Sequence, residues 1–214
     1  MSAPLTIPLT SGKFYHIFNN GNNGINLFYN PKNYGYFLRK YDEYLSDYLE
    51  TFCFCLMPNH FHLLVRVKEI NNMNENAFRL NDWKKLKDKA EIENKDLAGL
   101  IVSESFRRFF MAYTKAVNKQ EEREGSLFKK YFKRKEVTNL KYLQQLVCYI
   151  HRNPVHHGFN IEFADYPWNS YSRMLEERIT KLQKKEVIDW FGDRENYMFM
   201  HQQKLNLIDD LIIE

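Results

Sequence analysis

Residues 51–67, with the sequence TFCFCLMPNHFHLLVRV, indicate how the chain folds. Residues 51–57 form a dense apolar run, and residues 60–67 form a second short run with the character of a strand. Pro58-Asn59 separates the two runs, and two short strands joined by two turn residues make a β-hairpin. The sequence therefore predicts an antiparallel hairpin with its turn at residues 58 and 59.

The segments on either side of this hairpin supply the other elements of a domain. We expect strands at residues 13–18 and at the end of residues 126–137. Helices are expected after Asn30-Pro31, at residues 97–118 and at residues 140–152, where Pro154 should end the helix. This order is that of the split βαβ, ferredoxin-like arrangement. It predicts an α+β fold in which an antiparallel sheet carries helices on one face, followed by a C-terminal helical extension.

Length and composition agree with one folded domain and some additions to it. The chain has 214 residues, of which 44% are hydrophobic, and this is enough for one sizeable core. We place the main domain at residues 13–172. Within it, residues 68–97 are rich in Asn, Lys, Glu and Asp and are interpreted as a charged insertion outside the core. Residues 173–214 form the predicted helical extension.

Charge and cysteine content say less about function. The net charge is +4, from 31 basic and 27 acidic residues, which alone does not indicate a nucleic-acid partner. Cys53, Cys55 and Cys148 do not have the pattern of a disulfide framework. Residues 1–10 lack the features of a signal peptide, and no apolar run is long enough to span a bilayer. We therefore expect a cytoplasmic protein without a membrane partner.

Two histidines in the second strand of the hairpin are candidate metal ligands. Because side chains alternate along a strand, His60 and His62 share one face, while Phe61 and Leu63 point to the other. Two imidazoles placed in this way can hold one divalent ion. A structural pair of histidines is the commoner explanation of such a motif when it stands alone.

The helix predicted at residues 140–152 carries a candidate nucleophile. Tyr142, Tyr149 and Asn153 fall along one edge of its apolar stripe, so they lie at the rim of the core. His151 falls on the opposite border and is not assigned to the same site. Without the histidine pair, Tyr149 would be interpreted as an ordinary tyrosine at the edge of an amphipathic helix.

A basic and aromatic segment precedes that helix. Lysines and arginines neutralise phosphates, and aromatic side chains between them offer stacking faces for unpaired bases. A solvated basic face is an equally good explanation of the segment taken alone. The candidate DNA-binding residues are Lys129, Lys130, Tyr131, Lys133, Arg134 and Lys135, joined by Arg107 and Arg108 on the preceding helix.

Five segments follow one another in order over residues 13–172. They are FYHI at 14–17 with NGN at 20–22, LMPNHFHLLV at 56–65, GSLF at 125–128, YIHRNPV at 149–155, and DYPWNSY at 165–171. Together they resemble the REP-associated tyrosine transposases, the single-tyrosine branch of the HUH transposases. Any one of these motifs is modest support, whereas five in the same order are strong support.

The resemblance implies roles for the candidate residues. His60 and His62 would be metal ligands, Asn153 would supply a third ligand through its amide oxygen, and Tyr149 would be the nucleophile. Two imidazoles and an amide leave coordination positions open for a phosphate, and a divalent ion there would stabilise the charge that develops on it. We expect Mg²⁺ or Mn²⁺. The expected function is a transposase and single-strand endonuclease that cleaves and rejoins single-stranded or hairpin DNA through a 5′-phosphotyrosine, acting as a monomer or homodimer.

Several alternatives remain open from the sequence. The protein could be a catalytically silent single-stranded nucleic-acid-binding protein, or a nuclease of the replication-initiator kind. Cys53 and Cys55 share a face, and Cys55 could lie opposite His62 in a structural zinc site. His156-His157 is a further histidine pair without an obvious third ligand. His16 on the first strand is interpreted as structural or as a group behind the metal ligands.

Overall fold

A four-stranded sheet forms the centre of the molecule, which is described here from a computed structural model covering residues 7–72 and 80–203. The strands are β1 (Phe14–Asn20), β2 (Leu49–Met57), β3 (His60–Val67) and β4 (Lys133–Val137). They lie in the order β2-β3-β1-β4, with each neighbouring pair antiparallel. The predicted hairpin is confirmed, because β2 ends at Met57 and β3 begins at His60. Short 3₁₀ turns lie at Asn22–Gly24 and Ile70–Asn72.

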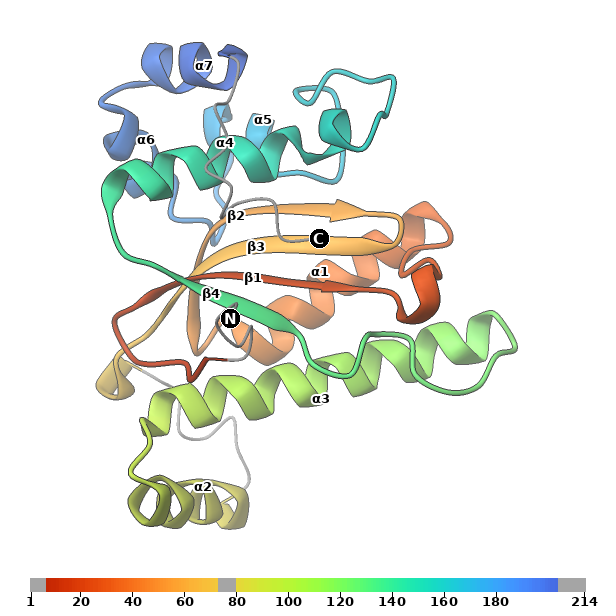
Figure 1. Cartoon of the computed structure of the whole chain (residues 1–214), viewed down its shortest axis with the longest axis vertical. Coiled ribbons are helices and arrows are strands. Elements are labelled where there is room, and N and C mark those ends of the chain that lie inside the picture. Colours follow the sequence, from red (N-terminus) through yellow and green to blue (C-terminus); the bar gives the residue numbers. More distant parts are fainter. Residues whose placement is uncertain (1–6, 73–79, 204–214) are drawn as a thin grey trace, which may run out of the picture.

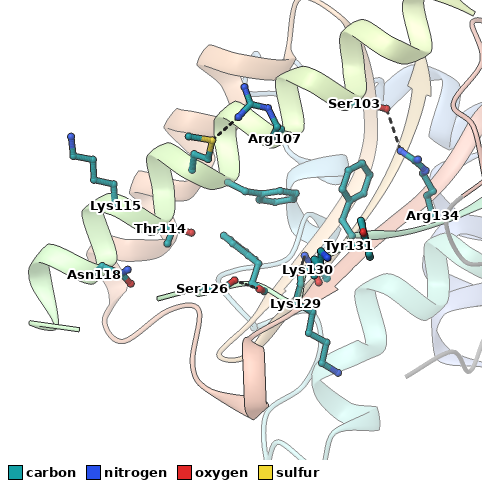
Figure 2. A pocket seen from close by; sticks show the side chains of 15 residues that line it. Ser103, Arg107, Thr114, Lys115, Asn118, Ser126, Lys129, Lys130, Tyr131 and Arg134 are labelled. Carbon is teal, nitrogen blue, oxygen red and sulfur yellow. Dashed lines mark hydrogen bonds between the residues drawn. The ribbon is translucent and has the colours of Figure 1, made fainter. Parts of the chain in front are cut away.

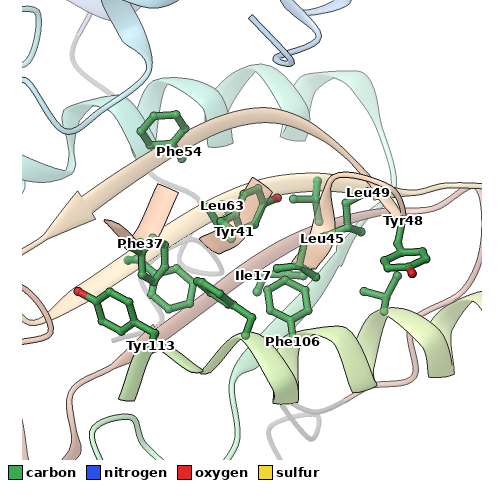
Figure 3. Close-up of a cluster of buried hydrophobic side chains, with 14 of the residues drawn as sticks. Ile17, Phe37, Tyr41, Leu45, Tyr48, Leu49, Phe54, Leu63, Phe106 and Tyr113 are labelled. Atoms are coloured by element: carbon green, nitrogen blue, oxygen red, sulfur yellow. The ribbon is translucent and has the colours of Figure 1, made fainter. Parts of the chain in front are cut away.

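Helices α1 (Pro31–Leu45) and α3 (Leu97–Gln120) cover one face of this sheet (Figure 1). The Asn30 side chain accepts a hydrogen bond from the Lys32 amide, and the Asp96 side chain accepts one from the Gly99 amide, so both helices begin at a capping residue. Their apolar faces meet alternate strand residues in one core, shown in Figure 3, which includes Ile17, Phe37, Tyr41, Phe54, Leu63, Phe106 and Tyr113.

Helix α4 (Leu140–His156) lies on the opposite face of the sheet (Figure 1). The α+β class and the ferredoxin-like order are confirmed, and the expectation of helices on one face holds for α1 and α3 but is wrong for α4. This face is also apolar, since Cys53, Cys55 and Leu64 form a second core with Leu146 and Ile150 of α4. A bulge between Thr51 and Cys53 turns both Phe52 and Cys53 toward that side.

Pro154 does not end this helix, contrary to the sequence prediction. The helix continues to His156, and its ordinary hydrogen bonding resumes after the proline, because the His157 amide donates to the Asn153 carbonyl at 3.0 Å. Proline removes only its own amide donor, and near a helix end the packing of one face outweighs that loss. Asn153 therefore stays in register with Tyr149, one turn earlier.

The charged insertion contains a helix that the sequence analysis did not predict. Helix α2 (Leu80–Glu93) lies beyond α3, on the side away from the sheet (Figure 1). Trp83 of α2 is buried against the first core, and Asp82 accepts a hydrogen bond from Arg108 of α3 at 2.9 Å. Part of the insertion, residues 73–79, lies outside the described residues.

The C-terminal extension is helical, as expected, and it packs on the outer side of α4. It contains α5 (Tyr171–Leu175), α6 (Lys184–Phe191) and α7 (Arg194–Gln202). Val187, Phe191 and Tyr197 are buried in the same core as α4. The last part of the predicted extension, residues 204–214, lies outside the described residues. Among the helices described, none combines the length and the apolar character needed to cross a membrane.

A buried polar cluster joins α7 to α4. His151 Nδ1 lies 2.9 Å from His201 Nε2, and His151 Nε2 lies 2.8 Å from Ser170 Oγ. The Arg152 guanidinium donates to the carbonyls of His201 and Gln203. His151 therefore belongs to this structural cluster, on the side of α4 away from the histidine pair, as its position on the helix predicted.

Buried histidines should make the stability of the fold fall in weak acid, and His201 is one of them. Burial lowers the pKa of His201 from about 6.5 to about 4. Between these values the unfolded chain binds a proton that the folded chain does not, so the contribution of His201 is complete above pH 6.5 and is lost as the pH falls toward 4. At pH 5 the loss should be about 2 kcal/mol, or ~4–8 °C in melting temperature.

Thermal unfolding followed by circular dichroism measures this effect in the parent and in His201→Gln. The variant has no titrating group at position 201, so its stability should depend less on pH between 7 and 5. Equal pH dependence in both proteins would contradict the assignment.

Candidate active site

The histidine pair lies in the middle of the sheet, on the face that α4 covers. Strand β3 runs between β2 and β1, with His60 opposite Asn20 and His62 opposite Phe18. Both side chains are buried, with 4% and 2% of their surface exposed. Phe61 and Leu63 point into the first core, on the other face. The predicted alternation is therefore confirmed.

Helix α4 brings Tyr149 and Asn153 onto this pair. The Tyr149 ring stands edge-on to His62, with their centroids 5.7 Å apart and their planes at 83°. The Asn153 Oδ1 atom lies 2.9 Å from His60 Nε2. Tyr149 is 3% exposed and Asn153 is fully buried. The four residues singled out as nucleophile and metal ligands thus meet at one place, contributed by one strand and one helix.

The contacts of His60 show a clustering of hydrogen-bond acceptors. Its Nδ1 atom lies 2.8 Å from Asn59 Oδ1, and its Nε2 atom lies 2.9 Å from Asn153 Oδ1. A neutral imidazole has one N–H, so it can donate to only one of the two oxygens. The other ring nitrogen is then available as a ligand for a cation.

His62 has a second acceptor directed into the same space. Its Nδ1 atom lies 2.9 Å from His16 Nε2, and its Nε2 atom is buried without a hydrogen-bond partner. Burial, together with neighbouring histidines, holds the pKa of His62 well below its usual value, and burial lowers the pKa of His16 to about 3. Both rings are therefore neutral. If the Nδ1–H of His62 donates to His16, its Nε2 presents a lone pair.

One pair of these donor atoms has the separation that two adjacent ligands of Mg²⁺ or Mn²⁺ would have. The 2.9 Å between His60 Nε2 and Asn153 Oδ1 matches the spacing of about 3 Å between adjacent ligands that are each ~2.1 Å from one octahedral ion. The side-chain amide nitrogen of Asn153 is also buried without a partner. Within the described residues no group of three or more His, Cys, Asp or Glu side chains could hold a metal ion.

Four residues around the site were not predicted as part of it. Phe18 stacks on both His16 and His62, and Asn59 contacts His60. His156 stacks on Tyr149 at 5.7 Å, and the His157 ring lies 4.5 Å from that of His60. His156 and His157 follow Tyr149 and Asn153 at helical spacings. The sequence analysis did not detect this because it ended the helix at Pro154.

The alternative zinc site gains little from the structure. Cys55 is paired with His62 in the β2–β3 register, as the two-residue turn predicted. Cys53 and Cys55 are fully buried, however, and burial raises the pKa of both thiols well above the usual value. Zinc binds the thiolate, which this environment disfavours. Both side chains pack in the core beneath α4.

The basic segment divides between the two faces of β4. Lys133 lies over the Phe18 ring at 5.6 Å, and Lys135 lies over the Tyr142 ring at 5.5 Å, both on the side of α4. Arg134 points to the side of α3, where it donates to Ser103 Oγ at 3.2 Å. The alternation of side chains along an edge strand thus separates three cations that are consecutive in the sequence.

The other predicted DNA-binding residues gather on the α3 side. A pocket of about 1020 Å³ lies between α3 and residues 126–134, and Figure 2 shows its lining. Arg107, Lys129, Lys130, Tyr131 and Arg134 all line it. Arg108 does not, because its guanidinium is paired with Asp82 and Glu104. Arg108 thereby joins α2 to α3.

Comparison with known proteins agrees with these observations. No protein-family model matches the chain. A curated Haemophilus influenzae protein named as a REP-associated tyrosine transposase is 26% identical over 155 residues, which cover 64% of this chain and 76% of that protein. A solved structure of a REP-associated tyrosine transposase bound to a REP hairpin aligns with a TM-score of 0.53 and 17% identity, over 82% of this chain and 86% of that one.

The structural likeness supports the fold, and the sequence likeness extends over most of the curated relative. The curated relative belongs to the family that the five ordered motifs resemble, and three of these motifs contribute residues to the site. The resemblance inferred from the sequence is confirmed: the chain is similar in sequence to a curated REP-associated tyrosine transposase and similar in fold to a solved one.

Proposed function

We propose that this protein is a DNA transposase that cleaves and rejoins single-stranded or hairpin DNA, with Tyr149 as the nucleophile. The observation that carries the proposal is that one helix places the Tyr149 ring over His62 and the Asn153 oxygen against His60. A purely structural tyrosine does not require acceptor atoms gathered beside it. The names of the curated relative and of the solved structure support the same reaction class.

In the proposed reaction the phenolic oxygen of Tyr149 attacks a phosphodiester phosphorus. The new bond joins this oxygen to the phosphorus, and the bond from the phosphorus to the 3′-oxygen of the preceding nucleotide breaks. The phenol loses its proton, and the released 3′-oxygen gains one. Because the 5′-phosphotyrosine keeps the energy of the phosphodiester, a free 3′-hydroxyl can attack it and rejoin the strands without ATP.

His60, His62 and Asn153 would hold the divalent ion that this reaction needs. Such an ion stabilises negative charge on the non-bridging oxygens of the phosphate. The protein prepares the ligands through their neighbours: Asn59 contacts His60 Nδ1, and His16 contacts His62 Nδ1. These contacts hold each ring so that its Nε2 atom faces the site, as is usual for histidine ligands.

Lys133 and Lys135 are placed to guide the DNA toward Tyr149. Both lie on the α4 side of the edge strand, and Lys133 covers Phe18, whose ring stacks on His62. Their ammonium groups can neutralise phosphates next to the scissile one. A catalytically silent nucleic-acid-binding protein would use the same cations, so only the chemistry of Tyr149 separates the two functions.

Replacing Tyr149 by phenylalanine tests the proposed nucleophile. Tyr149→Phe keeps the buried ring and removes the attacking oxygen, so folding and DNA binding should survive. Incubation of labelled single-stranded hairpins with Mn²⁺ should give a covalent adduct with the parent, and the adduct and cleavage should fall by at least about a thousandfold in the variant, as when other nucleophiles are removed.

Tyr142→Phe is the matched control, because Tyr142 occupies the same edge of α4 beside Lys135. It should still form the adduct, and mass spectrometry should place the phosphate on Tyr149. An adduct on Tyr142, or cleavage at the parental rate in Tyr149→Phe, would show that the nucleophile is misassigned. Absence of the adduct from the parent would favour the silent binding protein.

Removal of a ligand tests the proposed metal site separately from cleavage. At a Mn²⁺ concentration about a hundred times the dissociation constant, bound metal should stabilise the parent by ~2.7 kcal/mol, which raises the melting temperature by about 5–10 °C. His60→Ala and His62→Ala should lose this increase, whereas Tyr149→Phe should keep it. The same increase in both histidine variants would mean that the ion binds elsewhere.

A further inference from the structure

The pocket on the α3 side of β4 is not explained by the proposed chemistry. It lies around the sheet edge from Tyr149, because Arg134 faces α3 while its neighbours Lys133 and Lys135 face α4. Helix α3 forms one wall, and residues 126–134 form the other (Figure 2). The volume of about 1020 Å³ is at the upper end of the range for ligand pockets.

The charge of the lining is of one sign. Five cations line the pocket, and no carboxylate is among the lining residues; the cations are Arg107, Lys115, Lys129, Lys130 and Arg134. Arg107 is paired with Glu104 of its own helix, whereas Lys115, Lys129 and Lys130 are exposed. A concave surface of this kind favours an anionic ligand.

Arg134 is the cation that most needs such a ligand. It is half-buried, it stacks on the Phe132 ring at 4.9 Å, and its Nε atom is buried without a hydrogen-bond partner. No ion pair with a carboxylate is formed by Arg134 in the described part of the chain, and its hydrogen bond to Ser103 is to a neutral hydroxyl. A desolvated guanidinium without a counter-charge is destabilising, and a phosphate is a matching partner for its planar donor group.

Aromatic side chains give the pocket a second kind of binding surface. Tyr131 is 65% exposed although it is a large aromatic residue, and Lys130 lies over its ring at 5.3 Å. Phe110, Phe128 and Phe132 line the pocket behind it. Exposed aromatic faces between cations are the combination that binds successive nucleotides of a single strand, the base by stacking and the backbone by charge.

We infer that this pocket is a second DNA subsite, which binds a phosphodiester at Arg134 and stacks an unpaired base on Tyr131. The inference rests on the proposed function for the identity of the polymer. The strand then passes around the edge of β4, from Tyr131 and Arg134 on one face to Lys133 and Tyr149 on the other. The subsite holds nucleotides away from the scissile phosphate and selects DNA that is unpaired at that point.

Binding to two strands of equal length and equal charge, one with bases and one without, separates the two parts of the subsite. The probes are a fluorescent oligodeoxythymidine and a fully abasic strand with the same number of phosphates. Fluorescence anisotropy is measured over a range of salt concentrations, with full-length protein in EDTA, so that cleavage does not occur. The variants are Arg134→Met and Tyr131→Ala, and Lys32→Met on α1 is the control for loss of one exposed positive charge.

Arg134→Met should weaken binding of both strands about tenfold and should reduce the salt slope by about 0.7, the value for one phosphate contact on a single strand. Tyr131→Ala should weaken binding of oligodeoxythymidine about tenfold and leave the abasic strand within about twofold of the parent. Lys32→Met should change neither affinity by more than about twofold. Arg134→Met should melt no lower than the parent, because it removes an uncompensated, partly desolvated charge.

Unchanged affinity and salt slope in both pocket variants would overturn the inference, as would an Arg134→Met variant that melts lower than the parent but binds equally well. The Tyr131 side chain is largely exposed, so Tyr131→Ala should fold normally, and weaker binding by this variant cannot be explained by unfolding. Failure of the subsite and failure of the proposed reaction give different results. Adduct formation at Tyr149 with unchanged binding by the pocket variants would support the reaction and exclude the subsite. Weakened binding in the pocket variants without any adduct in the parent would keep the subsite and remove the reaction.

Discussion

The turn at Pro58-Asn59 fixes the pairing of β2 with β3, and the remainder of the site depends on that register. Its carbonyls are held from outside the hairpin: the Pro58 carbonyl accepts from the amides of Leu27 and Phe28, and the Asn59 carbonyl accepts from the amide of Gly21. A slip of one residue would turn every side chain of β3 to the opposite face. It would bring His60 and His62 under α1 and α3 and expose Phe61 to α4. The burial of Phe61, Leu63 and Val65 in the first core therefore keeps His60 and His62 on the α4 face. It offsets the cost of burying two polar imidazole rings there.

Much of this arrangement follows from local patterns. The hairpin, the alternation along β3 and the shared edge of Tyr149 and Asn153 are set by periodicities of two and of 3.6 residues, which a sequence displays directly. The meeting of His60 with Asn153 is different, because 93 residues separate them and no periodicity connects a strand with a distant helix. The family motifs supplied that connection, and the geometry of the structure supports it.

The predictions that were wrong concern contacts between residues that are far apart in the sequence. A proline ends a helix when the loss of its amide hydrogen bond outweighs the contacts of the helix. Helix α4 packs along both its sheet-facing and its outer surfaces, so it continues past Pro154. Helix α2 was missed because its charged sequence shows a weak apolar stripe, while contacts with α3 through Trp83 and Asp82 hold it in place. Packing of helices on both faces was missed because strand order alone does not show where a helix that follows the last strand will lie.

The anchoring of α4 by residues 201–203 has a consequence for how the protein folds during synthesis. The first core draws its residues from positions 9–128, so it is complete while the remainder of the chain is still being synthesised, and domains generally fold from the N-terminus as they emerge. The helix that bears Tyr149 acquires its outer contacts, those of His151 with His201 and of Arg152 with Gln203, only when residues 201–203 have left the ribosome. A nascent chain therefore presents the strand that bears His60 and His62 well before the helix that bears Tyr149 acquires its outer contacts.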